Sequence, residues 1–252
     1  MKWFIFTATV AGLALLTDDM TAARAADITV LASNGVKAAV VELVPQFEKE
    51  TGHKLNFTWG ASNLLAKQVE GGEAFDIVIV TPALIKGLIK QGKVVDGSTV
   101  DLARVGLGVA VKEGAPKPDI STIEAFKKTL LNAKAIAYTT AGQSGLHFIR
   151  VAEKLGIAEQ VKAKGKTVAA GAAAEFVAKG EADTAVQLIP ELASVSGVEV
   201  VGPFPAELQS YIVLTGGVGT NAKDKMAAQA LIKYLTTPAA ISVIKAKGME
   251  PG

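Results

Sequence analysis

Several absences restrict the chemistry open to this chain. Cysteine is missing from all 252 residues, which excludes disulfide bonds, thiolate metal sites and a thiol nucleophile. Histidine occurs only as His53 and His147, and neither belongs to an H-E-x-x-H metal motif or to a complete G-x-S-x-G nucleophile elbow. A full G-x-x-x-x-G-K-[ST] phosphate loop is also absent. The sequence therefore predicts no metal, no cofactor and no recognised enzyme motif.

An excess of charge of one sign is missing as well. The chain has 26 basic and 24 acidic residues, a net charge of +2. This charge is too small and too evenly spread to predict a nucleic-acid partner. With 50% hydrophobic residues, the chain can bury a core for one large domain or for two lobes of about 100 residues each.

Apart from the N-terminus, the chain has no apolar run long enough to span a membrane. At the N-terminus, Lys2 precedes the apolar segment 3–16, and Ala23-Arg24-Ala25 ends the region. This order is typical of a secretory signal peptide, and the apolar part falls short of the roughly 20 residues of a membrane helix. We expect cleavage after Ala25, which makes 1–25 a signal peptide and the mature protein periplasmic and soluble. An uncleaved anchor is the alternative.

The stretch 28–52 contains the unit that organises the chain. An apolar strand at 28–31 leads through the small turn Ala32-Ser33-Asn34-Gly35 into a helix with one apolar face. The unpaired N–H groups of a first helical turn form an anion site over the end of the preceding strand. Alternatively, Ser33 or Asn34 caps the helix and has no further role.

The same unit recurs twice, which favours a shared ligand. A strand at 55–59 leads to Ser62 and a helix, and a strand at 136–138 leads to the loop 139–145 and a helix. Neutral hydroxyl and backbone donors that converge on one centre suit a small anion. The predicted ligand-binding residues are Ser33, Asn34, Ser62, Ala141, Gly142, Ser144, Val186, Gln187 and Tyr211.

Strands and helices alternate along the chain, which predicts an α/β fold with mostly parallel sheets flanked by helices. The β-prone segments 101–111 and 211–214 interrupt this alternation, and we interpret them as two crossings between lobes. The predicted division is residues 26–106 with 215–252 in lobe 1 and residues 107–214 in lobe 2.

Six segments resemble the molybdate-type periplasmic solute-binding proteins of ABC importers: ASNG, WGASN, GEAFDIVIV, YTTAGQSG, TAVQLIPEL and GPFPAELQSYIV. The resemblance implies the two-lobed type II periplasmic-binding-protein fold, with an anion held in the cleft and ABC importer membrane components as partners. It also implies hydroxyl donors from Ser33 and Ser62, backbone donors near Ala141 and Val186, and a hydroxyl from Tyr211. We expect a monomer.

Other features resemble a side branch of that family that includes an aconitate isomerase. Asn34 and Gly60-Ala61 stand where the molybdate-type proteins usually carry serines, and Gln187 and the GQSG loop match the side branch. An isomerase of an unsaturated tricarboxylate is therefore the alternative function. It would need a base, for which His147 or Tyr211 is the candidate, and a nearby cation from Arg150, Lys37 or Lys67. A receptor that presents ligand to a signalling partner is a third hypothesis.

Overall fold

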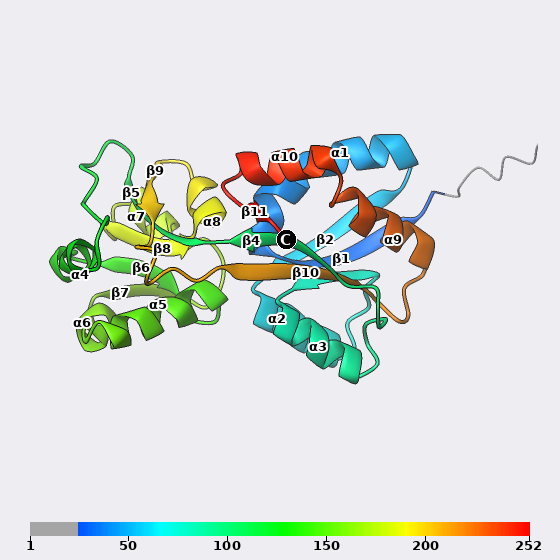
Figure 1. Cartoon of the computed structure of the whole chain (residues 1–252), viewed down its shortest axis with the longest axis horizontal. Helices are drawn as coiled ribbons and strands as arrows, with labels where there is room; N and C mark the ends of the chain where they lie inside the picture. Colours follow the sequence, from blue (N-terminus) through cyan, green and yellow to red (C-terminus); the bar gives the residue numbers. More distant parts are fainter. Residues whose placement is uncertain (1–24) are drawn as a thin grey trace, which may run out of the picture.

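The computed structural model describes residues 25–252 and contains two β-sheets, each flanked by helices (Figure 1). Residues 1–24, and with them nearly all of the predicted signal peptide 1–25, lie outside the described residues. The two sheets lie side by side along the long axis of the molecule (Figure 1). The predicted α/β fold class is confirmed.

The first sheet has six strands in the order β11-β4-β10-β3-β1-β2. Helices α1, α9 and α10 cover one face, and α2 and α3 cover the other (Figure 1). The elements of this half are β1 (Asp27–Ser33), the 3₁₀ turn η1 (Asn34–Val36), α1 (Lys37–Thr51), β2 (Lys54–Gly60), α2 (Ser62–Glu70), β3 (Ile77–Val80), α3 (Pro82–Lys90), β4 (Val100–Val105), β10 (Ile212–Val218), α9 (Lys225–Tyr234), α10 (Pro238–Ala246) and β11 (Glu250–Pro251).

The second sheet has five strands in the order β7-β6-β8-β5-β9. The elements of this half are β5 (Leu107–Lys112), α4 (Ile123–Asn132), β6 (Ile136–Thr139), α5 (Gln143–Lys154), α6 (Ala158–Ala163), β7 (Gly165–Val168), α7 (Glu175–Ala178), β8 (Thr184–Leu188), α8 (Ile189–Ala193) and β9 (Val198–Pro203).

Side chains of the central strands are buried on both faces, which explains their continuous apolar sequence. In β3, Ile77 and Ile79 join the core under α1 and α9, whereas Val78 and Val80 pack toward α2 and α3. This alternation follows from the two-residue period of a strand. The sequence of β3 therefore predicts its central position correctly.

Each sheet is mixed. The pairs β1–β2, β1–β3, β6–β7 and β6–β8 are parallel, and the pairs made by β4, β5 and β10 are antiparallel. The connections from β4 to β5 and from β9 to β10 pass from one half to the other without an intervening helix. A helical crossover joins parallel strands of one sheet, whereas a direct connection can bring a strand into a sheet in the antiparallel direction.

The chain passes from the first sheet to the second at Gly106, between β4 and β5. It returns ahead of β10, and all of β10 from Ile212 onward pairs with strands of the first sheet. The predicted boundary 214/215 falls inside this strand, so by strand pairing residues 212–214 go with the first sheet. The division into lobes itself stays a prediction.

His53 lies in the short connection between α1 and β2. Its side chain is buried because it packs beside Phe47, at 6.0 Å between ring centroids, and its Nδ1 accepts a hydrogen bond from the Ala26 N–H at 3.1 Å. His53 therefore anchors the start of β1.

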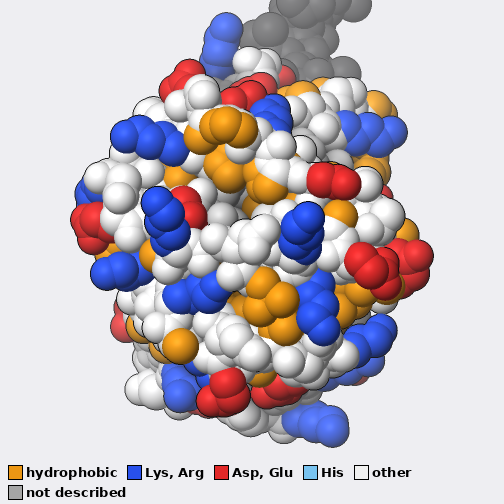
Figure 2. All heavy atoms as spheres, turned by 90° about the vertical axis from the view of Figure 1, so that its left-hand side faces the viewer, with side chains coloured by type: hydrophobic (Ala, Val, Ile, Leu, Met, Phe, Trp, Pro, Cys, Tyr) orange, Lys and Arg blue, Asp and Glu red, His pale blue; other side chains and the backbone are white. Residues whose placement is uncertain are grey.

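The described residues contain no single helix that is long and apolar enough to cross a membrane. Helices α9 and α10 meet the length and composition requirement only together, across a bend of 59°, and both pack on the first sheet. At the end of the molecule formed by the second half, acidic and basic side chains are interspersed (Figure 2).

Candidate functional site

A small cavity lies where the carboxyl ends of β1, β2, β6 and β8 face one another, and a helix or helical turn follows each of these strands. The free space inside is about 30 Å³, compared with roughly 10–15 Å³ for one water molecule. The lining residues are Ser33, Asn34, Ala61, Ser62, Thr139, Gly142, Gln143, Ser144, Ala170, Gly171, Leu188, Glu191 and Ile212. We call this space the inner cavity.

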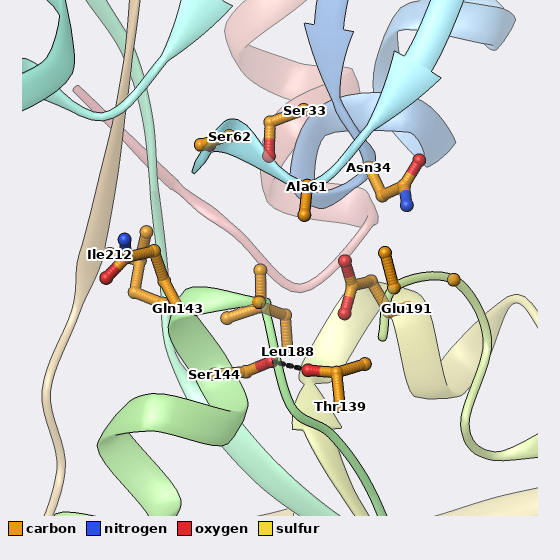
Figure 3. Close-up of a pocket in the computed structure, with 13 residues that line it drawn as sticks. Ser33, Asn34, Ala61, Ser62, Thr139, Gln143, Ser144, Leu188, Glu191 and Ile212 are labelled. Carbon is orange, nitrogen blue, oxygen red and sulfur yellow. Dashed lines mark hydrogen bonds between the residues drawn. The ribbon is translucent and has the colours of Figure 1, made fainter. Parts of the chain in front are cut away.

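The first half of the molecule contributes two hydroxyl groups that are not used as helix caps. Ser33 precedes η1 and makes no capping hydrogen bond, and Ser62 is the first residue of α2, whose cap position is Ala61. Both serines are buried, and Figure 3 shows the Ser33 hydroxyl pointing into the gap between the two halves. Neither serine side chain therefore acts as a helix cap in the structure.

The second half contributes the start of α5. Thr139 and Ser144 are buried, and their hydroxyl oxygens lie 3.4 Å apart (Figure 3). Helix α5 approaches the end of β6 so closely that a Cβ atom on Gly145 would lie 1.6 Å from the Thr139 carbonyl oxygen. A side chain at this position is sterically excluded, so the glycine allows the first turn of α5 to sit over the strand end.

Five of the nine predicted binding residues line the inner cavity: Ser33, Asn34, Ser62, Gly142 and Ser144. Ala141 does not, because its N–H already donates to the Ala169 carbonyl at 2.9 Å. Val186 also lies outside, fully buried in β8. Strand β8 continues to Leu188, and this residue lines the cavity instead.

Tyr211 is not brought to the inner cavity either. Its side chain is 44% exposed, and the Arg104 guanidinium lies 5.0 Å from its ring centroid. A hydrogen bond with Glu250 raises the pKa of the Tyr211 hydroxyl. Tyr211 immediately precedes β10, and its hydroxyl is paired with Glu250 of the C-terminal strand β11.

The proposed base His147 and the proposed cations lie elsewhere too. The Nε2 atom of His147 is 3.1 Å from the Leu208 carbonyl oxygen, and Arg150 and Lys67 are exposed. Lys37 lines a neighbouring cavity of about 550 Å³, where its ammonium is 5.8 Å from the Trp59 ring centroid. This outer cavity shares Asn34, Gly171 and Glu191 with the inner one.

Glu191 is the ionisable residue of the cavity lining, and it is not among the nine residues predicted from the sequence. It occupies the first turn of α8, and Figure 3 shows its carboxyl group pointing toward the cleft below Asn34 and Ala61. Burial raises the pKa of Glu191 from 4.5 to about 7, against the opposing effect of hydrogen bonds from the Leu188 N–H and the Gln187 amide. Pro190 is a sequence signal for the position of Glu191. Proline favours the first turn of a helix, which places Glu191 in the helical turn that directly follows β8.

Gln187 has a different place from the predicted one. Its side chain is completely buried and lies behind the cavity, where it accepts from the Ala174 N–H at 3.0 Å and donates to the Gly171 carbonyl at 2.9 Å and to Glu191 Oε2 at 3.0 Å. Gln187 therefore positions Glu191 and the loop 171–174.

The two halves also touch directly beside the cavity. The side-chain amide of Asn63, on α2, donates to the Ala141 carbonyl at 3.3 Å and accepts from Gln143 Nε2 at 3.0 Å. These bonds join the first half to the start of α5 in the second half. Access to the inner cavity therefore depends on how the halves are held together.

Among residues 25–252, the lining of the inner cavity combines hydroxyl groups and helix N-termini with one carboxyl group and no basic side chain. Partial positive charge at helix N-termini favours a small anion. Within residues 25–252 no group of three histidine or acidic side chains is arranged to hold a metal ion.

Comparison with known proteins places this architecture in a family. Residues 28–250 match the bacterial extracellular solute-binding proteins. The chain is 32% identical over 230 residues to an aconitate isomerase of a Pseudomonas species, covering 89% of this chain and 87% of that protein. It is 31% identical over 241 residues to a molybdate-binding protein of Azotobacter vinelandii, covering 90% and 91%.

Solved structures share the fold. The substrate-binding domain of a putative molybdenum ABC transporter from Clostridium difficile superimposes with a TM-score of 0.69 at 20% sequence identity, covering 90% of this chain and 100% of that one. The likeness confirms the two-sheet architecture of type II periplasmic binding proteins.

Proposed function

Because the chain belongs to the bacterial extracellular solute-binding proteins, we propose that it captures a small anion in the inner cavity and presents it to an ABC-type importer. The observation that supports this proposal most directly is the convergence of Ser33, Ser62 and Ser144 with helix N-termini in one cavity. These neutral donors can replace the water around an anion without a counter-charge. Similarity to a molybdate-binding protein and to an ABC transporter component supports the same assignment.

The proposal includes removal of residues 1–25 and a periplasmic mature protein, in agreement with the extracellular family. It also includes binding as a monomer that closes around the ligand. The nine residues predicted from the sequence are reduced in this proposal to Ser33, Asn34, Ser62, Gly142 and Ser144, joined by Glu191.

The size of the inner cavity favours a compact ligand. About 30 Å³ of free space suits a tetrahedral oxyanion better than a tricarboxylate, which would need the halves to separate. The outer cavity beside Lys37 and Trp59 offers more room and a cation. A larger organic anion would therefore extend from the inner cavity into the outer one.

The second candidate function is isomerisation of an unsaturated tricarboxylate, and Glu191 is the observation that favours it. Its carboxyl group lines both cavities, and its pKa of about 7 suits a group that alternately accepts and returns a proton near neutral pH. Glu191 would break one C–H bond of the substrate, and the same proton would form a new C–H bond at the other end of the allylic system. The similarity to an aconitate isomerase supports this candidate.

A thermal-unfolding panel separates the candidates, since a ligand that binds only the folded state stabilises it by RT ln(1 + [L]/Kd), about 2.7 kcal/mol at a hundredfold excess over Kd. The panel contains molybdate, tungstate, sulfate, phosphate, citrate, and cis- and trans-aconitate. We expect at least one anion to raise the melting temperature by several degrees, whereas sodium chloride at equal ionic strength does not.

A shift with the oxyanions alone supports uptake of an oxyanion. A shift with the aconitates, together with interconversion of cis- and trans-aconitate by the purified protein, supports the isomerase. If no anion on the panel stabilises the protein, the proposed function is wrong.

A further inference from the structure

The carboxyl group of Glu191 is held in one orientation by its neighbours. The Ala174 N–H can only donate, so the Gln187 amide must turn its oxygen toward Ala174 and its NH₂ group toward Gly171 and Glu191. Gln187 therefore donates to Glu191 Oε2 at 3.0 Å. The Leu188 N–H also donates to this carboxyl group, and a proton on Glu191 is best placed on the oxygen that does not accept from Gln187.

No basic group neutralises Glu191 in the described part of the chain. Its surroundings come from β8, β5, β9, η1 and the loop before α7, as well as from the other lining residues of the cavity. Of the nearby charged groups, Lys37 faces the outer cavity beside Trp59, Lys247 pairs with Glu42, Glu199 pairs with Lys117, and Glu175 pairs with Lys179. Glu191 is the one ionisable side chain that lines the inner cavity.

An anion in the inner cavity would be repelled by an ionised Glu191. Like charges at hydrogen-bond distance in a partly buried site destabilise each other, and the group that can take up a proton does so. Burial by the protein itself already raises the pKa of the Glu191 carboxyl group to about 7. A bound anion raises it further.

On this geometry, and resting on the proposed function, we infer that Glu191 binds the ligand as a neutral carboxylic acid. Its hydroxyl donates a hydrogen bond to a ligand oxygen, and one proton enters from solvent with each anion bound above neutral pH. Glu191 is thereby a specificity residue. A neutral carboxylic acid donates a hydrogen bond through its hydroxyl, so it favours ligands whose oxygen atoms carry no proton and can only accept hydrogen bonds. It discriminates against ligands that present a hydroxyl proton at this position.

Isothermal titration calorimetry of the mature protein with molybdate and with trans-aconitate tests this inference. Each titration is run from pH 6 to 9, and at pH 8.5 in two buffers of different ionisation enthalpy. For wild type we expect uptake of close to one proton at pH 8.5 and an affinity that falls by about tenfold per pH unit above neutrality.

In the Glu191→Gln variant, the side chain is a neutral amide. Its NH₂ group can donate a hydrogen bond to the ligand in place of the hydroxyl of the carboxylic acid. We expect its affinity to be the same from pH 6 to 9, without proton uptake. The matched control is Glu73→Gln, an exposed carboxylate in the loop before β3, which should keep the wild-type slope and the wild-type proton uptake.

Binding without proton uptake by wild type overturns the inference and leaves the proposed function intact. Loss of binding at every pH in Glu191→Gln, with a folded protein by circular dichroism, also overturns it, because a neutral donor should be accepted. If neither anion binds wild type at pH 6, the titrations are repeated with the panel anion that stabilises the protein most, and absence of binding by every anion of the panel rejects the proposed function and this inference together.

Discussion

At the scale of single residues, Ser33 and Ser62 have the clearest role. Both hydroxyl groups are buried at the inner cavity, and neither caps the helix that follows it. A hydroxyl with no structural partner nearby is available for a ligand, and a hydrogen bond to a charged ligand contributes about 1.5–3 kcal/mol. These two serines should therefore control affinity more than stability.

The Ser62→Ala substitution tests this role. We expect the affinity for molybdate, or for the panel anion that stabilises more, to fall by roughly 10- to 100-fold, since each 1.4 kcal/mol corresponds to a factor of ten. The melting temperature without ligand should change by less than about 2 °C, because no hydrogen bond of the fold is lost. Titration calorimetry and thermal unfolding give the two values. Ser242→Ala, at an exposed position of α10, is the control, and an equal affinity in both variants would remove Ser62 from the site.

At the scale of elements, the starts of α2 and α5 hold the loops that line the cavity. The close packing of α5 against β6 depends on Gly142 and Gly145. A Cβ atom added to Gly142 would lie 2.6 Å from Thr139 Oγ1, and one added to Gly145 would lie 1.6 Å from the Thr139 carbonyl oxygen. The glycines of the GQSG loop thus have a packing reason. They let the N–H groups of a helix start reach the centre of the molecule.

The Gly145→Ala substitution should push the start of α5 away from β6. We expect a lower melting temperature, from a clash that costs about 1–3 kcal/mol as overpacking does in cores, and at least tenfold weaker anion binding. Gly87→Ala is the matched control, since Gly87 lies within α3 with nothing near a new Cβ atom. It should stabilise the protein by about 0.5–1 kcal/mol. Equal melting temperatures for the two variants would contradict the packing argument.

At the scale of the whole molecule, Asn63 links the two halves through its bonds to Ala141 and Gln143. Two hydrogen bonds of about 0.5–1.5 kcal/mol each can shift an equilibrium between open and closed arrangements. An anion bound between the halves would favour the closed arrangement further.

The Asn63→Ala variant should therefore populate the open arrangement more. We expect anion affinity to fall by about 5- to 150-fold, because apparent affinity scales with the fraction of molecules competent to bind. Small-angle X-ray scattering should show a larger radius of gyration without ligand and a normal one at saturation. Asn132→Ala, at the exposed end of α4, serves as the control. Identical scattering and affinity in both variants would show that Asn63 does not control closure.

Local patterns in the chain were enough to predict the α/β class and the loops that meet at the site. The apolar run of β3, the periodic face of α1 and the small residues at 33–35 and 61–62 act over a few residues, because side-chain direction follows the period of the strand or helix. Five of the residues predicted from these loops line the inner cavity. Pro190 is a local signal of the same kind, because proline favours the first turn of a helix, the turn of α8 that contains Glu191.

Only the tertiary structure decided which groups of these loops face the cavity and how the pKa of the ionisable group among them is shifted. The Ala141 N–H is taken by Ala169, Leu188 replaces Val186, and Tyr211 turns outward to Arg104. These outcomes depend on partners that are distant in sequence or on the exact end of a strand, which a local pattern does not contain. The pKa of Glu191 has the same origin: burial between segments from both halves withdraws the carboxyl group from water, and desolvation is a property of the packed molecule.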